Sequence, residues 1–190
     1  MLGKRCFAAL AAAVLAGPAA AQLSGVFEGE QTAYCIASQA GFDSRLALAG
    51  PASVSSSTTV ARLSFRPDGT GDATLRLLSI GHASTSPGAT PASEVEAPCA
   101  FTYSLAPGGL VNVAFATCLA TALSGPSAGQ VVTESHGRNA QYARTYDSTK
   151  LIAVGTRPAV ETITNLLAGV TLQRICHRDG VLYFRPQGAR

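Results

Sequence analysis

The sequence is poor in several residue types and patterns, and each deficit narrows the class of protein. It contains no tryptophan, and after residue 21 its only lysine is Lys150, which we attribute to composition bias. No Cys-x-x-Cys or His-x-x-x-His spacing is present, which argues against a metal site. After residue 21 the longest apolar stretch, residues 110–123, contains Asn112 and is shorter than the roughly 20 residues that span a bilayer. We therefore expect no metal, no cofactor and no transmembrane segment in this part of the chain.

The first 21 residues have the three parts of an export signal. A positive pair, Lys4-Arg5, precedes an uninterrupted apolar run at residues 7–16 and the small residues Ala19-Ala20-Ala21. This pattern predicts a signal peptide over residues 1–21, cleaved before Gln22. A transmembrane anchor is the alternative, but the apolar run is shorter than a bilayer core requires. We expect the protein to be periplasmic or secreted.

Removal of 21 residues from 190 leaves 169, the size of a single domain over residues 22–190. This remainder holds twelve basic and eleven acidic residues, for a net charge of +1. A near-neutral balance does not provide the basic surface that nucleic-acid binding requires. Nucleic acid is therefore not an expected partner.

The residue pattern predicts an all-β domain. Short runs of Val, Leu, Phe, Tyr and Thr alternate with Gly, Pro, Asp and Ser, which is typical of consecutive hairpins. At most one short helix is expected, within residues 32–48. An antiparallel meander of this size closes as a small barrel or packs as a two-sheet sandwich, and we favour the barrel. The predicted strands are residues 23–30, 59–65, 72–80, 99–105, 110–118, 131–135, 150–154, 160–165, 170–177 and 181–185.

Several predicted turns have a local chemical cause. Pro67 presets φ and Gly69 permits a positive φ in the turn Arg66-Pro67-Asp68-Gly69. Pro107-Gly108-Gly109 and Asp179-Gly180 each predict a hairpin, the second with a two-residue loop. Residues 51–58 and the Ser/Pro-rich residues 82–98 are predicted to be loops, the second unusually long.

Four of the five cysteines follow the predicted cleavage site, and in an oxidising compartment an even number is typical of disulfides. A two-residue loop at Gly108-Gly109 places Cys99 directly opposite Cys118, with Cα atoms about 4.5–5.5 Å apart. Cys35 and Cys176 then pair by elimination. The sequence therefore predicts the disulfides Cys99–Cys118 and Cys35–Cys176.

This register conflicts with the bulky side chains of the same hairpin. It places Phe101 on one face and Val113 on the other. A loop one residue longer would bring the bulky side chains together but would separate the cysteines. A bulge near Ala116-Thr117 satisfies both requirements, so we keep the disulfide and predict the bulge.

One catalytic motif is present. Residues 125–129 match G-x-S-x-G, with Ser127 as the nucleophile and with Asp147 and His177 following in the chain order of that hydrolase class. A β-prone run follows the motif, whereas the motif requires a helix there. The match therefore predicts a loop, with a serine hydrolase as a remote alternative.

The other chemically suggestive residues have ordinary explanations. The histidines are far apart in the sequence, and Glu94 and Glu96 lie in a predicted solvated loop. Arginines are concentrated in the last third of the chain, where alternating strands would form either a patch for an anionic ligand or solvated strand faces. The histidines are His82, His136 and His177, and the arginines are Arg138, Arg144, Arg174, Arg178 and Arg185.

Gly25-Val26-Phe27 followed by Gly29 resembles the G-x-W that opens the first strand of lipocalins and related calycin barrels. Phe27 stands where that family has tryptophan. Arg174, near Cys176 in the last part of the chain, is similar to the arginine that packs over that aromatic residue. The resemblance implies an up-and-down barrel with an apolar cup for a small hydrophobic ligand.

Three functional classes remain. We favour an exported, non-enzymatic barrel that binds a small apolar or amphipathic molecule, although the pattern identifies no ligand-binding residues. The alternative is an envelope or secreted module that contacts another protein, as an inhibitor or adhesion module, through an apolar face left by Val111, Val113 and Phe115. The remote alternative is the hydrolase that uses Ser127.

Overall fold

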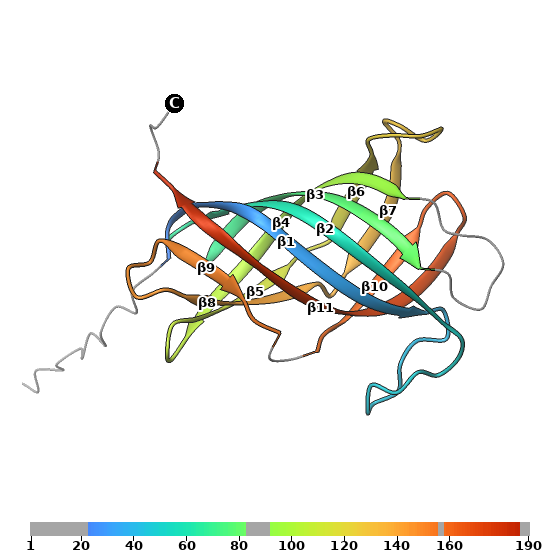
Figure 1. Ribbon diagram of the computed structural model, residues 1–190, viewed down its shortest axis with the longest axis horizontal. Helices are drawn as coiled ribbons and strands as arrows, with labels where there is room; N and C mark the ends of the chain where they lie inside the picture. Colours follow the sequence, from blue (N-terminus) through green and yellow to red (C-terminus); the bar gives the residue numbers. More distant parts are fainter. Residues whose placement is uncertain (1–22, 83–91, 156–157, 187–190) are drawn as a thin grey trace, which may run out of the picture.

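The computed structural model describes residues 23–82, 92–155 and 158–186, and these residues form eleven β-strands and no helix (Figure 1). All strand pairs are antiparallel, which confirms the all-β prediction. The predicted signal peptide lies outside the described residues. The strands are β1 (Gly25–Ser38), β2 (Ala52–Phe65), β3 (Thr70–His82), β4 (Ser93–Ala106), β5 (Leu110–Phe115), β6 (Cys118–Ala122), β7 (Val131–His136), β8 (Asn139–Arg144), β9 (Lys150–Ala153), β10 (Val160–Asn165) and β11 (Val170–Arg185).

The strands form one sheet that closes on itself, and not the two sheets of a sandwich. The ring runs β1-β2-β3-β4-β5-β8-β9-β11 and closes where β11 pairs with β1. The order departs from the expected meander after β5, because β6, β7 and β10 form a second arm between β4 and β11. Closure leaves few free strand edges, which explains why a single sheet of this size is stable.

Strands β4 and β11 each pair with two different strands, at different positions along their length. Strand β4 pairs with β5 from Phe101 onward, and with β6 at Val95 and Glu96. Strand β11 pairs with β10 up to Ile175 and with β9 from Val181. Among the described residues, 176–180 of β11 therefore have no strand partner on that side, and this interruption of the sheet positions the candidate site.

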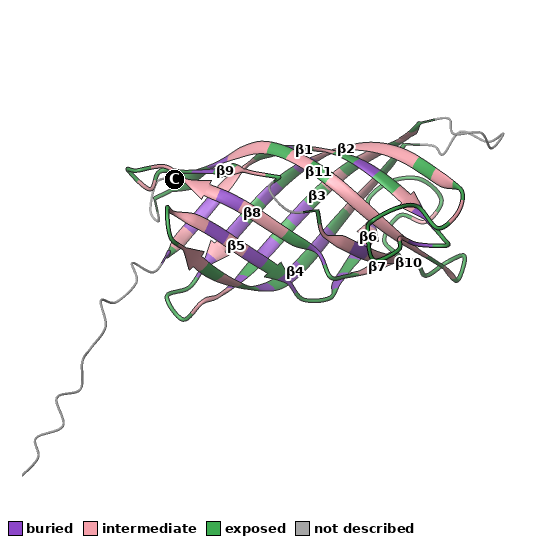
Figure 2. Cartoon of the chain, turned by 90° about the horizontal axis from the view of Figure 1, so that it is seen from below, coloured by how far each residue is buried: buried purple, intermediate pink, exposed green. Residues whose placement is uncertain are grey.

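The hydrophobic core fills the part of the ring enclosed by β5, β8 and β9. Alternate residues point inward, so buried and exposed positions alternate along the strands (Figure 2). Phe65 lies edge-on to both Phe27 and Phe101, with ring centroids 5.7 and 5.0 Å apart. Burial of each side chain of this size contributes roughly 1.5–3 kcal/mol. Leu63, Val111, Leu151 and Leu182 complete this core and are fully buried.

The hairpin predicted at Asp179-Gly180 is wrong, because β11 runs without a turn through both residues. Gly180 has a different role: a Cβ there would lie 2.4 Å from the carbonyl oxygen of Glu30 on β1. Gly29 plays the matching part on β1, where a Cβ would lie 2.1 Å from the carbonyl oxygen of Val181. The two glycines therefore permit the backbones of β1 and β11 to approach closely, which is one reason for glycine in the interior of a strand.

The predicted loop over residues 51–58 is largely strand, and parts of the candidate helix and of the second predicted loop are strand too, while residues 39–48 form no helix. Residues 52–58 belong to β2, and residues 32–38 belong to β1. In the loop predicted over residues 82–98, His82 ends β3 and Ser93 begins β4, and residues 83–91 lie outside the described part. Pro98 is tolerated in β4 because its only strand partner there is Thr74 of β3.

Both predicted disulfides are present, with Cα atoms 4.1 Å apart in Cys35–Cys176 and 4.9 Å apart in Cys99–Cys118. Phe101 pairs with Phe115, which requires the hairpin loop to be one residue longer than predicted. Val95 pairs with Ala122, which is the predicted register. The register therefore changes by one residue between β5 and β6, at Ala116-Thr117, where we predicted the bulge.

Candidate functional site

The interruption of the sheet contains a pocket of about 450 Å³, called the side pocket here. One wall is the outer face of β4, β5 and β8, with Thr102, Ala114 and Asn139. The opposite wall is the β9–β10 connection, with Val154 and Pro158. The pocket reaches through the sheet to inward-facing side chains of β1, β8 and β11: Gln31, Tyr142 and Arg178.

A buried hydrogen bond forms part of the pocket floor. Gln31 Nε2 donates to the Tyr142 hydroxyl at 3.0 Å, although the residues are 111 positions apart in the chain. Burial raises the pKa of Tyr142, so this phenol is neutral at physiological pH. Tyr142 therefore offers polar atoms without charge beneath largely apolar walls.

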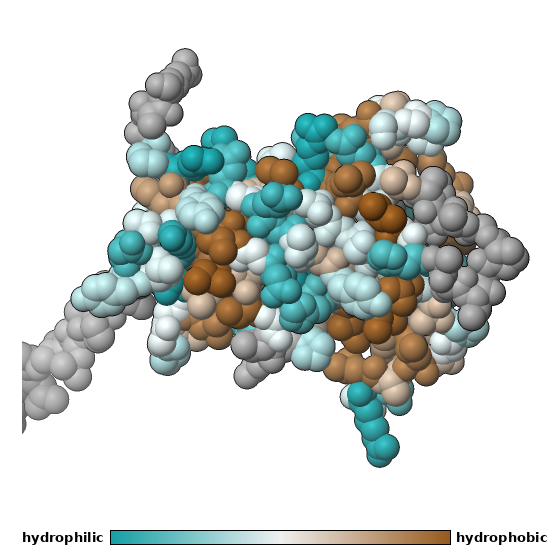
Figure 3. Space-filling view, in the orientation of Figure 1, coloured by the Kyte–Doolittle hydropathy of each residue, from teal (hydrophilic) through white to brown (hydrophobic). Residues whose placement is uncertain are grey.

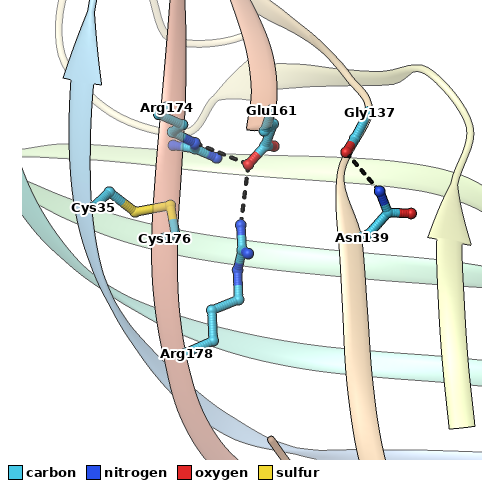
Figure 4. A network of polar contacts seen from close by, with 7 residues as sticks. All are labelled: Cys35, Gly137, Asn139, Glu161, Arg174, Cys176 and Arg178. Carbon is cyan, nitrogen blue, oxygen red and sulfur yellow. Dashed lines mark hydrogen bonds and ion pairs between the residues drawn. A yellow bond between two sulfur atoms is a disulfide. The ribbon is translucent and has the colours of Figure 1, made fainter. Parts of the chain in front are cut away.

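A cluster of charged side chains adjoins the floor. Glu161 of β10 accepts two hydrogen bonds on Oε2, one from Arg174 Nε at 2.9 Å and one from Arg178 Nη2 at 3.0 Å (Figure 4). Burial alone would raise the pKa of Glu161, but the charges of Arg174, Arg138 and Arg178 hold it at about 2. The carboxylate is therefore ionised, with Oε2 bonded to two arginines and the buried Oε1 without a hydrogen-bond partner among the described residues.

Arg138 is the third guanidinium of this cluster. It lies in the short connection between β7 and β8, and its guanidinium carbon is 5.2 Å from the centroid of the Phe115 ring. Burial and the neighbouring charge of Arg178 lower the pKa of Arg138 to about 10, so it remains charged at neutral pH. Its Nε is buried and has no hydrogen-bond partner. Three buried or half-buried arginines thus face one carboxylate.

The inner face beyond this cluster, toward β6, β7 and β10, has a different composition. It carries several small polar side chains beside the larger Ile163 and Leu172, and they are half-buried where those of the core are fully buried. We call this the polar end of the interior. It includes Ser55, Ser57, Ser79, Thr133 and Ser135.

The structure separates the three histidines that the sequence singled out. His82 bonds Ser56, and His177 pairs with Asp179 on its own strand. His136 contacts Thr117 and Glu134. Among the described residues no group of three His, Cys, Asp or Glu side chains is arranged to hold a metal ion.

The G-x-S-x-G motif forms a tight loop between β6 and β7. The backbone N–H of Gln130 donates to the carbonyl of Ser127, and a strand follows directly, as predicted. The Asp147 carboxylate accepts hydrogen bonds from Thr145 and Thr149 in its own turn, which lower its pKa to about 2. Ser127, Asp147 and His177 are therefore not joined in a hydrogen-bonded triad.

The arginine-rich last third of the chain divides between two places. Arg138, Arg174 and Arg178 come together inside the ring around Glu161, whereas Arg185 pairs with Glu28 at 3.5 Å. Of the acidic pair predicted to lie in a solvated loop, Glu94 instead bonds Arg76 across β3 and β4. Strand register decides which arginines lie inside the ring. No motif or spacing in the sequence indicated that Gln31, Tyr142 and Glu161 would belong to the site.

The residues behind the lipocalin resemblance lie far apart. Phe27 pairs with Phe184 in the core, whereas Arg174 pairs with Ala37 toward the other end of the β1–β11 ladder and bonds Glu161. Arg174 therefore does not pack over Phe27. The aromatic neighbours of Phe27 are Phe65 and Phe184.

The apolar face expected from Val111, Val113 and Phe115 is also absent from the surface, because these side chains are buried in the core. A different group is exposed on the outer face of β1, β2 and β3. We call it the outer patch: exposed Tyr34, Ile36 and Ile80, with the half-buried Val54 opposite Ile36. In Figure 3 hydrophobic side chains gather on the right-hand part of this face, where β1 lies between β2 and β11.

No family model matches the chain, and no curated protein or solved structure is significantly similar to it. Within the described ranges, no helix has the length and apolar character needed to cross a membrane.

Proposed function

We propose that this chain is an exported binding protein that holds a small amphipathic molecule in the side pocket. The observation that carries the proposal is the pocket itself, which joins apolar walls to the polar side chains of Gln31, Tyr142 and Arg178. Its volume of about 450 Å³ falls within the roughly 300–1,000 Å³ of small-molecule sites. The two disulfides and the signal-like first 21 residues support a periplasmic or secreted location.

The chemistry of the walls favours an amphipathic ligand over a fully polar one. Ala114, Ala140, Ala153 and Pro158 offer apolar surface, Thr102 and Asn139 add hydrogen-bonding groups on the outer wall, and Gln31, Tyr142 and Arg178 add them at the floor. A few convergent polar groups within an apolar pocket orient a ligand that has one polar end. Because aromatic side chains fill the centre of the core, the proposed binding site is the side pocket.

Titration with the neutral fluorophore N-phenyl-1-naphthylamine tests the proposal. We expect saturable fluorescence enhancement, which Ala114→Trp should abolish because an indole at this exposed wall position fills the pocket. Ala168→Trp, in the exposed β10–β11 turn, is the matched control and should bind as the unsubstituted protein does. Equal binding by both variants would place the fluorophore elsewhere and reject the side pocket.

The outer patch supports a second candidate, contact with an envelope or secreted protein. Tyr34 and Ile80 are each about half exposed, at 54% and 48%, and exposed apolar side chains grouped on one sheet face are typical of interaction surfaces. If this candidate is correct, Ile80→Glu abolishes co-purification of a specific partner from the exported fraction, whereas Ala114→Trp retains it. The opposite pattern would favour the side pocket.

A further inference from the structure

The interior of the ring carries more positive than negative charge. Arg138, Arg174 and Arg178 surround Glu161, and Arg138 and Glu161 are the only buried side chains that carry a charge at neutral pH among the described residues. All three guanidinium groups are charged at neutral pH, so two positive charges lack a protein counter-ion. Uncompensated charge inside a protein is unfavourable and is normally paired.

Arg138 is the clearest sign of a missing anion. Only 6% of it is exposed, its Nε has no acceptor among the described residues, and its guanidinium lies over the Phe115 ring, while its charge also acts on Glu161. The ring interacts with the cation but accepts no conventional hydrogen bond from Nε. Arg174 and Arg178 each donate one hydrogen bond to Glu161 Oε2, whereas Arg138 donates none to a carboxylate among the described residues, so its guanidinium has the most donors to offer.

This charge is continuous with the side pocket. Arg178 both lines the pocket and bonds Glu161. Asn139 and Ala140, which follow Arg138 in the chain, line the same pocket. Gly137, which precedes it, approaches the carbonyl of Val160 next to Glu161, and Figure 4 shows Gly137 and Asn139 on the neighbouring segment of chain. Arg138 therefore lies beside the cluster and next in sequence to two residues of the pocket lining.

We infer that the side pocket selects amphipathic anions, and that the carboxylate of the ligand binds beside Arg178 and accepts hydrogen bonds from Arg138. This inference rests on the proposed function and names its ligand class. Glu161 already shows that these guanidinium groups are arranged around a carboxylate, and Arg–carboxylate geometry suits bonds from planar donors. The apolar walls at Ala153 and Pro158 then hold the aliphatic part.

Ligands with one chain length and different headgroups test the inference on the unsubstituted protein. Calorimetric titration at pH 8 compares decanoate, decanol and decylammonium. We expect decanoate to bind about tenfold more tightly than decanol, or better, because charge-assisted hydrogen bonds are added, and decylammonium to bind most weakly. The Nε–H resonances of Arg138 and Arg178 should shift with decanoate and not with decanol. Equal affinity for decanoate and decanol would overturn the inference.

Substitutions then assign the preference to Arg138. Arg138→Met keeps a side chain of similar length on Phe115 but removes the charge, so the preference for decanoate should disappear while decanol affinity is unchanged. Arg138→Lys should restore part of the preference. Arg62→Met, on the exposed face of β2, is the matched control and should leave it unchanged. If the preference for decanoate survives in Arg138→Met, the role of Arg138 is rejected. It is also rejected if the preference is lost equally in Arg62→Met.

The two proposals fail in different ways. If none of the three ligands binds, or if Ala114→Trp leaves their affinities unchanged, the proposed function fails. If decanol binds, is blocked by Ala114→Trp and competes equally with decanoate, the proposed function stands and the anion selectivity is wrong.

Discussion

Arg178 Nη2 donates to Glu161 Oε2 at 3.0 Å, and this bond links the side pocket to the charged cluster inside the ring. Glu161 is on β10 and Arg178 is on β11, at the place where β11 has lost its pairing with β10 and has not yet met β9. The interruption of the sheet therefore has two consequences. It opens the pocket, and it brings buried charge to the pocket floor.

Replacement of Glu161 should be costly at neutral pH. In Glu161→Gln the three guanidinium groups lose their only carboxylate, so the free energy of unfolding should fall by about 3–5 kcal/mol. Urea unfolding at pH 7 measures this loss. Glu96→Gln, on the exposed face of β4, is the control and should change stability by less than about 0.5 kcal/mol.

The same carboxylate should make stability depend on acidity. The pKa of Glu161 is depressed from an ordinary value of 4.5 to about 2, so its contribution is fully present above pH 4.5 and is lost as the pH falls toward 2. The depression corresponds to a contribution of the order of 3 kcal/mol. The difference in unfolding free energy between the unsubstituted protein and Glu161→Gln should therefore shrink between pH 5 and pH 2.5. A difference that stays constant over this range would contradict the assignment.

Removal of the Arg138 charge should not destabilise the fold. Burial lowers the pKa of Arg138 from 12.5 to about 10. Below pH 10 the side chain is charged in the folded protein, and burying this charge lowers the free energy of unfolding. We expect Arg138→Met to raise the free energy of unfolding by about 1 kcal/mol, measured by urea unfolding at pH 7. A loss of more than about 1 kcal/mol would show that Arg138 is a structural partner of Glu161 and Phe115.

Closure of the ring should be sensitive to Gly180. A methyl group there meets the backbone of Glu30 and Gln31 at 2.4 and 2.7 Å, and neither backbone can turn aside. Gly180→Ala should lower the free energy of unfolding by at least about 3 kcal/mol. Gly108→Ala is the control: its φ is also positive, but a Cβ meets nothing within 4 Å, so only about 1–2 kcal/mol of backbone strain is expected. Equal losses would remove the close-approach explanation.

Ser127→Ala should leave any esterase activity of the purified protein unchanged. The G-x-S-x-G loop is followed by β7, Asp147 is bonded within its own turn, and His177 pairs with Asp179. Initial rates with p-nitrophenyl acetate measure the activity. A large loss of rate in this variant alone would establish Ser127 as a nucleophile.

Features with a local cause were predictable from the sequence. The turn Arg66-Pro67-Asp68-Gly69 formed as expected, with the N–H of Gly69 donating to the carbonyl of Arg66. The two disulfides and the bulge at Ala116-Thr117 followed from one requirement, that Cys99 face Cys118 while Phe101 faces Phe115. Covalent geometry and side-chain volume acted together there, so a local argument was sufficient.

Features that depend on distant partners were not predictable. Asp179-Gly180 has the composition of a hairpin loop, but Gly180 is required by the backbone of β1, about 150 positions earlier in the chain. Ser55 and Ser57 suggested a loop, yet β2 pairs there with β1 and β3 along its whole length. The side pocket depends on where β9 and β10 leave β11, and no residue pattern specifies that position.

The most direct test of ligand binding in the side pocket is a crystal structure of the protein with bromodecanol, in which anomalous scattering locates the bromine. We predict a bromine peak in the side pocket, between Ala114 of β5 and Pro158 of the β9–β10 connection. The hydroxyl end should lie toward Arg178 and Tyr142. A peak confined to the outer patch near Ile36 and Ile80, or one in the polar end beside Ser57 and Ser79, would contradict it.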